Sequence, residues 1–170
     1  YDRKYSSIAM LEELCWDLDE IFKRVDLLHI SGIVPALSKK WQSWTVEIVK
    51  KAKEYGCLVS FDMNYRSKLW EYEEAYPCFQ QILPYVDILS AGRLDAIHFL
   101  QVASDEEEVS LEEIYRRVKE KYANIKVLYS TKRNVISTNH HELQGFYVGE
   151  DNNFVESKVY NIQPVIDRVG

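Results

Sequence analysis

An acid, an amide and a guanidinium occur at alternate positions, at Asp62, Asn64 and Arg66, directly after the apolar run 57–61. The run predicts a short buried strand, and ligands of open α/β sheets bind at the carboxyl ends of the strands. An extended backbone would place the three side chains on one side. They could then handle a phosphate or a carboxylate, with the acid as proton or metal acceptor and the guanidinium as an anion fork. An Asp62–Arg66 ion pair that locks the turn explains the same residues equally well.

A second polar cluster lies at Tyr1 and Arg3. If Arg3 and Arg66 converge, their two guanidinium groups form a clamp with the geometry that a planar carboxylate favours. The alternative is a pair of unrelated surface arginines.

The segment 130–134 places hydroxyls, two cations and an amide between two predicted strands. A turn of this composition, with Thr131, Lys132 and Arg133 at its centre, can cradle phosphate oxygens. Asn134 fits such a turn because asparagine tolerates a positive φ better than any residue except glycine. A solvated hairpin is the commoner structure for a segment of this kind.

The hydrophobic pattern predicts strands that alternate with helices as far as residue 130. Strands are expected at 26–32, 57–61, 86–90 and 126–130, and helices at 38–54, 73–83, 94–100 and 110–122. Such alternation predicts an α/β domain in which helices flank a mostly parallel sheet. After Ser130, runs at 135–137, 143–148 and 154–160 predict an antiparallel meander that continues the sheet toward the C-terminal end. Nothing between residues 1 and 170 indicates an internal domain boundary.

The bulk properties of the 170-residue sequence set limits on its function. A net charge of −6 without a basic stripe argues against nucleic acid as the main partner. No apolar run has the length of a membrane span, and no signal peptide opens the sequence. Three widely spaced cysteines without a C-x-x-C pattern predict reduced, mostly buried thiols in a cytoplasmic protein. Neither end resembles a natural terminus, so we expect an internal portion of a longer protein.

The histidines do not indicate a metal site. His29 lies on an apolar strand and is expected to be a core histidine. His140 and His141 occupy a predicted turn without cysteine or carboxylate partners at metal spacing, which argues against zinc.

Taken together, these segments resemble the ribokinase-like (pfkB) family of sugar kinases, and most closely its kinases of the sugar acid 2-keto-3-deoxygluconate. Residues 1–7 resemble the family's Tyr-x-Arg segment, and residues 61–70 resemble its D-x-N-x-R…L-W element. Both patterns are fairly specific for the sugar-acid kinases. Two more generic matches are the strand-to-helix connection 28–37 and the lead-in to a Gly-Ala-Gly-Asp signature at 167–170.

The resemblance implies a ribokinase-like fold and transfer of the γ-phosphate of ATP, used with Mg²⁺, to a hydroxyl of the sugar acid. Tyr1, Arg3 and Arg66 would then contact the sugar acid. Two segments would bind the nucleotide, through Asn64, Tyr65, Arg66, Thr131, Lys132 and Arg133. The family's catalytic Asp lies beyond Gly170, which makes residues 1–170 the central part of a single kinase domain. The implied partners are the sugar acid and ATP, and a homo-oligomer stays open because relatives often dimerise.

The sequence departs from the family pattern at two places. The family carries glycines where Thr131 and Asn134 stand, and many relatives carry Asn-x-x-Glu, linked to magnesium through waters, where this chain has Gly92 and Asp95. Asp95 could keep an indirect role in metal binding, whereas Gly92 has no side chain to do so. Two alternatives therefore stay open: a kinase of a neutral sugar or nucleoside, and a non-catalytic protein that binds a sugar acid.

Overall fold

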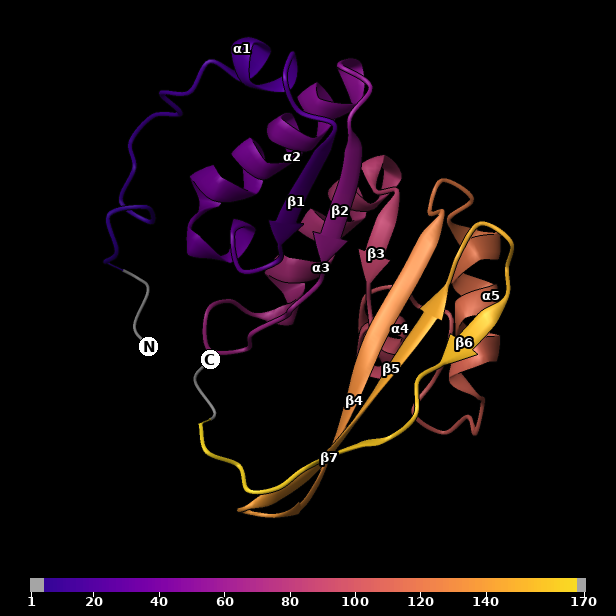
Figure 1. Ribbon diagram of the computed structural model, residues 1–170. Helices are drawn as coiled ribbons and strands as arrows, with labels where there is room; N and C mark the ends of the chain where they lie inside the picture. Colours follow the sequence, from indigo (N-terminus) through magenta and orange to yellow (C-terminus); the bar gives the residue numbers. More distant parts are fainter. Residues whose placement is uncertain (1–4, 168–170) are drawn as a thin grey trace.

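A seven-stranded sheet forms the centre of the computed structural model, which describes residues 5–167 (Figure 1). The strands are β1 (Leu27–Ser31), β2 (Leu58–Asp62), β3 (Ile88–Ser90), β4 (Val127–Ser137), β5 (His140–Val148), β6 (Phe154–Glu156) and β7 (Tyr160–Ile162). Their order is β1-β2-β3-β4-β5-β6, and β7 also pairs with β5. Strands β1 to β4 are parallel, whereas the pairs that involve β5 are antiparallel. The predicted fold class is confirmed.

Helices cover one face of this sheet (Figure 1). They are α1 (Leu18–Phe22), α2 (Lys39–Glu54), α3 (Tyr72–Ile82), α4 (Arg93–His98) and α5 (Leu111–Lys121), with short 3₁₀ helices η1 (Pro35–Leu37) and η2 (Leu83–Tyr85). The helices predicted at 38–54 and 110–122 agree with α2 and α5 to within one residue at each end. Their first turns are capped by Ser38 and Ser110, whose hydroxyls accept hydrogen bonds from Trp41 N and Glu113 N. No helix within residues 5–167 is long and apolar enough to cross a membrane.

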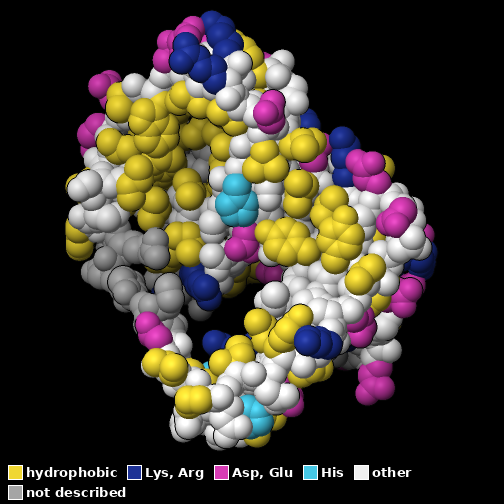
Figure 2. Space-filling model, in the orientation of Figure 1, with side chains coloured by type: hydrophobic (Ala, Val, Ile, Leu, Met, Phe, Trp, Pro, Cys, Tyr) yellow, Lys and Arg dark blue, Asp and Glu magenta, His cyan; other side chains and the backbone are white. Residues whose placement is uncertain are grey.

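One face of the sheet is covered by helices, and the other is more exposed. Phe61 of β2 is fully buried, and its ring packs edge-on against Phe79 of α3 with centroids 5.4 Å apart. Leu58, on the opposite face of the same strand, is 38% exposed, and its cross-strand neighbour Leu27 is 46% exposed. Apolar side chains gather on this second face (Figure 2). Among the described residues, it carries no helix.

The segment 130–134 is not the predicted turn. Strand β4 continues through it to Ser137, and Asn134 pairs with Glu142 of β5, to which its side-chain amide donates a hydrogen bond of 3.0 Å. The chain reverses after Ser137 instead, because β5 already begins at His140. This end of β4 is exposed on both faces, so it lacks the alternation that marks a half-buried strand. The strand predicted at 154–160 is likewise two strands, β6 and β7.

Of the two expectations about burial, the one for His29 is wrong and the one for mostly buried thiols is confirmed. His29 is exposed on the helix-free face of β1, where its Nδ1 lies 2.9 Å from Ser60 Oγ. The strand is apolar on both faces in sequence, but only one face is covered. Among the free cysteines, Cys57 and Cys78 are buried as predicted, whereas Cys15 is exposed.

Gly32, directly after β1, packs tightly against the residues at the end of β2. Its N–H donates to Asp62 O at 2.7 Å. A Cβ at residue 32 would lie 2.0 Å from Met63 O, which is inside the contact distance of any side chain. Only glycine allows the two strand ends to lie this close.

Replacing Gly32 with alanine is expected to lower the free energy of unfolding by about 2 kcal/mol or more, because the new methyl group must push two backbones apart. Gly145→Ala, in β5, is the matched control, since its Cβ would meet nothing closer than Ser157 Oγ at 3.7 Å. Urea unfolding of both variants measures the difference. Equal free energies of unfolding for the two variants would contradict the role given to Gly32.

Candidate functional site

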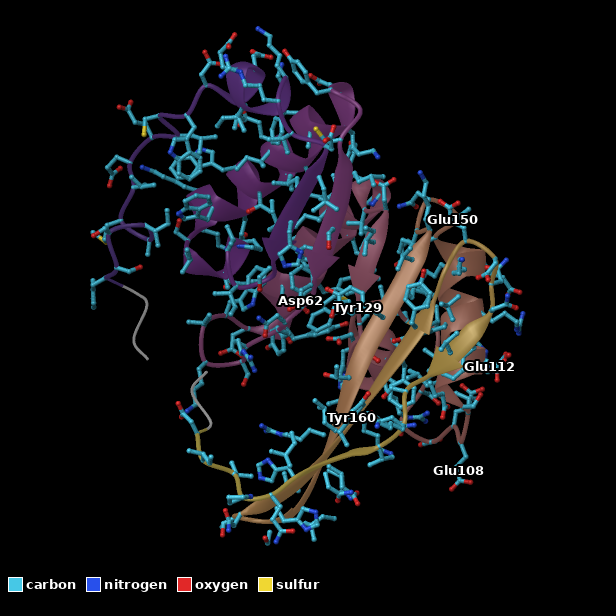
Figure 3. The ribbon with its side chains drawn as sticks, in the orientation of Figure 1. Asp62, Glu108, Glu112, Tyr129, Glu150 and Tyr160 are labelled. Atoms are coloured by element: carbon cyan, nitrogen blue, oxygen red, sulfur yellow. The ribbon has the colours of Figure 1, made fainter. Side chains whose placement is uncertain are left out.

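A row of polar side chains crosses the sheet at the carboxyl ends of the parallel strands. Ser31, Asp62, Ser90 and Tyr129 are successive cross-strand partners on β1, β2, β3 and β4. Asp62, at the end of β2, and Tyr129, on β4, extend from the helix-free face (Figure 3). The carboxyl ends of parallel strands are where open α/β sheets bind ligands.

A cavity of about 460 Å³ opens at this row. Strand ends and helix α4 supply its lining: Asp62, Asn64, Tyr65, Arg66, Ser90, Gly92, Leu94, Asp95, His98, Phe99, Ser130 and Thr131. The strands provide carboxylate and hydroxyl groups, and α4 with the residue after it provides a second carboxylate together with apolar and aromatic side chains. A concave site that combines a few polar groups with apolar walls is typical of small-molecule binding.

A larger cavity, of about 590 Å³, lies at the outer surface of α5. Glu112 and Glu150 line it, well away from the row of strand ends (Figure 3). Its charged groups are engaged locally: Arg116 pairs with Glu120, and Lys119 donates to the carbonyl of Gly149 at 2.6 Å. We therefore regard the strand-end cavity as the candidate site.

Asn64 reaches this cavity by a turn and not by an extended backbone. Strand β2 ends at Asp62, and Asn64 has a φ of +36°. Its Nδ2 donates to Ser31 Oγ at 3.0 Å, which ties the residues after β2 to the end of β1. The alternation predicted for Asp62, Asn64 and Arg66 therefore ends at Asn64, although all three side chains line one cavity. Of these two asparagines, Asn64 has the positive φ, whereas Asn134 lies in a strand.

Asp62 and Arg66 do not form the ion pair that would lock the turn. Arg66 is exposed at the rim of the cavity, and within residues 5–167 neither side chain has a hydrogen bond or an ion pair. Two opposite charges thus face one cavity without neutralising each other. A ligand that carries both an anionic group and hydroxyl groups or a cation could satisfy both.

Asp95 brings a second carboxylate to the cavity. It is the third residue of α4 and accepts a hydrogen bond from Gly92 N at 2.8 Å. Burial raises the pKa of Asp95 above its ordinary value; the Gly92 N–H opposes this shift, and the nearby charge of Asp62 adds to it. A neighbouring carboxylate that raises the pKa of Asp95 also favours a cation between the two groups.

The residues predicted to bind nucleotide on β4 fall in two places. Thr131 lines the strand-end cavity beside Ser130. Lys132 lines a separate cavity with Asn134 and Glu142, and Arg133 is exposed further along the strand. The strand geometry separates them because successive side chains point to opposite faces.

The comparison with known sequences decides the family. The profile of the pfkB family of carbohydrate kinases matches residues 2–147. The chain belongs to this family.

Solved and curated proteins agree with the pfkB assignment. A PfkB family carbohydrate kinase from Listeria grayi is 45% identical, with a TM-score of 0.91, over 100% of this chain and 51% of its own. The 2-dehydro-3-deoxygluconokinase structure from Thermotoga maritima is 32% identical, with a TM-score of 0.90 and the same coverage. A 2-dehydro-3-deoxygalactonokinase from Haloferax volcanii is 36% identical over 107 residues, which are 62% of this chain and 33% of that protein. The chain thus spans about half the length of the pfkB structures that it matches.

Some predicted site residues lie outside the described part of this pfkB chain. Tyr1 and Arg3 fall before residue 5, and most of the lead-in to the Gly-Ala-Gly-Asp signature falls after residue 167. The contact of Tyr1 and Arg3 with a sugar acid stays a prediction.

The cavity also contains residues that sequence reasoning missed. Ser90 ends a predicted strand, so the strand-end rule that found Asp62 could have found it. His98 carried no signal in the sequence, because its place depends on how α4 packs. Tyr72 of α3 donates to the His98 carbonyl at 2.5 Å, which fixes the end of that helix.

Asp95→Asn is expected to raise the free energy of unfolding at neutral pH. Since folding raises the pKa of Asp95, its ionised form destabilises the folded state above that pKa, and the penalty fades as pH falls through it. The amide keeps an acceptor for Gly92 N–H, so the gain should shrink as the pH approaches about 4, near the ordinary pKa of aspartate.

Urea unfolding at both pH values measures this effect, with Asp105→Asn as the control on an exposed acid. The control should leave stability unchanged at either pH. A loss of stability for Asp95→Asn at neutral pH would contradict the assignment.

Proposed function

We propose that this chain is part of an ATP-dependent sugar-acid kinase whose substrate is 2-keto-3-deoxygluconate. One observation carries the proposal. The Arg66 guanidinium, without an ion-pair partner among residues 5–167, borders a strand-end cavity that also contains Asp62. A planar carboxylate can accept two parallel hydrogen bonds from such a guanidinium, whereas a neutral sugar gives it no charge to pair with.

The names of the relatives support a sugar acid of this kind. The Thermotoga maritima structure is named 2-dehydro-3-deoxygluconokinase, and the Haloferax volcanii relative is named 2-dehydro-3-deoxygalactonokinase. The two acids differ in sugar configuration but share the carboxylate, so Arg66 alone would not distinguish them. The galactonate is therefore a second candidate substrate, favoured by the 36% identity to the Haloferax volcanii protein.

The nucleotide would lie with its phosphates against the strand ends. Asn64, Tyr65 and Thr131 line the same cavity as Arg66. Tyr65 is held in place because its hydroxyl donates to the Trp70 carbonyl at 3.2 Å and its ring packs 5.0 Å from that of Phe99. Lys132 and Arg133 lie further along β4, outside the cavity lining, and would add positive charge along that strand.

Magnesium fits the donor chemistry of the cavity. Mg²⁺ is usually held by one or two carboxylates together with phosphate oxygens and waters, and Asp62 and Asp95 supply two carboxylates here. Within residues 5–167 no larger group of His, Cys, Asp and Glu gathers as a metal cluster, which suits a cation that arrives with the phosphates. The ion would neutralise charge on the transferring phosphoryl group.

The residues of this chain would bind and position the reactants. Arg66 would orient the sugar acid, and Asn64 would keep the turn after β2 in place through Ser31. The proton acceptor that the family resemblance implies is the Asp of Gly-Ala-Gly-Asp, which is not among residues 1–170.

Arg66→Ala in the full-length protein is expected to raise KM for the sugar acid by about 10-fold or more and to lower kcat, because a charge-assisted bidentate contact is lost. Arg66→Lys should restore little, since an ammonium does not reproduce the fork. Steady-state kinetics measure both changes. Arg24→Ala, at an exposed arginine outside the cavity, is the control and should behave as wild type. Unchanged kinetics of Arg66→Ala would refute the site.

A coupled ADP-release assay on the full-length protein tests the function itself. With magnesium and ATP, it compares 2-keto-3-deoxygluconate and 2-keto-3-deoxygalactonate with ribose, fructose and adenosine. Turnover of the acids alone would support the proposal. Turnover of a neutral substrate would favour a kinase without a carboxylate clamp, and binding of the acid without turnover would favour a non-catalytic binding protein.

A further inference from the structure

Tyr115 reaches the wall of the strand-end cavity from inside the protein. It lies on α5 and is 1% exposed, with its ring centroid 6.0 Å from that of Phe154. Its hydroxyl lies 2.7 Å from Ser130 Oγ and 3.2 Å from the carbonyl oxygen of Ala91. One buried hydroxyl thus contacts Ser130 of β4 and the residue that follows β3.

Both contacts lead to groups that line the cavity. Ser130 itself lines it, beside Thr131. Ala91 directly precedes Gly92, whose N–H holds the Asp95 carboxylate at 2.8 Å. Asp95 lies close enough for its charge to act on the Tyr115 hydroxyl. Tyr115 therefore stands behind the two segments that face each other across the site.

The hydroxyl of Tyr115 has one hydrogen for two oxygen neighbours. If it donates to the Ala91 carbonyl, the Ser130 hydroxyl can donate to Tyr115 and then shows the cavity only lone pairs. If it donates to Ser130 Oγ, the serine hydrogen is free to point into the cavity. Only the second arrangement offers a donor to an anion, and a chain of hydroxyls strengthens each donor along it.

Burial raises the pKa of Tyr115 to about 12, so the phenol keeps its hydrogen at neutral pH. The hydroxyl can then change its acceptor without gaining or losing a charge. Ala91 O, which lies 3.2 Å away, is the longer of the two contacts.

We propose that Tyr115 is a positioning residue for the nucleotide phosphates: when they bind, its hydroxyl donates to Ser130 Oγ, which turns the Ser130 hydrogen toward a phosphate oxygen. The inference rests on the proposed kinase function. Although α5 does not line the cavity, a residue of this helix would then control a hydrogen-bond donor inside the cavity.

Tyr115→Phe in the full-length protein removes only the hydroxyl and keeps the ring against Phe154. The affinity for Mg-ATP, measured by isothermal titration, and KM for ATP should weaken about 3- to 10-fold, because a hydrogen bond to a charged group loses its support. KM for the sugar acid should stay unchanged.

Tyr122→Phe is the matched control. It removes another tyrosine hydroxyl at the end of α5, whose direct partner, Gln80 Oε1 at 3.2 Å, does not line the cavity and offers no hydroxyl to it. Thermal unfolding should show similar losses for the two variants, but only Tyr115→Phe should weaken ATP binding. Equal ATP affinities in the two variants would overturn the proposal.

Ser130→Ala completes a double-mutant cycle. If Tyr115 acts through Ser130, the double variant should bind ATP no more weakly than Ser130→Ala alone. Effects that multiply would show that the two hydroxyls act independently and would overturn the relay.

A fluorine probe tests the change of acceptor without removing a group. With 3-fluorotyrosine at position 115, the ¹⁹F resonance should shift when Mg-ATP is added to the full-length protein. A resonance that stays in place would contradict the inference. Wild-type protein that does not bind Mg-ATP would instead overturn the proposed function, and the relay with it.

Discussion

The parallel pairing of β1 to β4 is the constraint on which the rest of the structure depends. Because β1, β2 and β3 end in register with one another, their last side chains form one row with Tyr129, which pairs with Ser90 on the longer strand β4; the row contains Ser31, Asp62, Ser90 and Tyr129. The helices behind the sheet fix this row through buried aromatic contacts, such as that between Phe61 and Phe79. Helix α4 then adds Asp95 from the side. The charges of the cavity therefore come from the end of β2 and from α4, and strands β3 and β4 add hydroxyl groups.

The site is less stable than a fully paired arrangement of the same residues would be. Asp62 and Arg66 remain without ion pairs among the described residues, and Asp95 ionises against the cost of burial. Such unneutralised groups are commonly found where a ligand supplies the missing partner. Asn64 differs from these groups. Its backbone is in a strained conformation, but its side-chain amide is hydrogen-bonded to Ser31 at the neighbouring strand end.

Sequence reasoning predicted the parts that depend on local pattern. The strands β1 to β3 and the helices α2 to α5 follow from apolar periodicity, whereas the short helix α1 was not predicted; Asp62 follows from its place after a buried run. The predictions from the hydrophobic pattern failed where the solvent exposure of a strand differs from what its residue types indicate. Residues 130–134 are polar because β4 is solvated on both faces there. His29 has apolar neighbours in the sequence but lies on the uncovered face of the sheet. The role of Tyr115 could not be read from sequence, because its two contacts join segments that only the packing of α5 brings together.

The close approach at Gly32 has a consequence for how substrate preference can change. A backbone contact leaves no side chain to exchange, so the ends of β1 and β2 behave as one rigid piece under substitution. Substitutions that change the ligand preference without unfolding the sheet are thus best placed on the wall formed by α4. There, Leu94 and His98 of α4 are exposed at the cavity and free to vary in size and polarity. In a directed library, diversity belongs on that helix, while the glycine junction serves as the fixed frame.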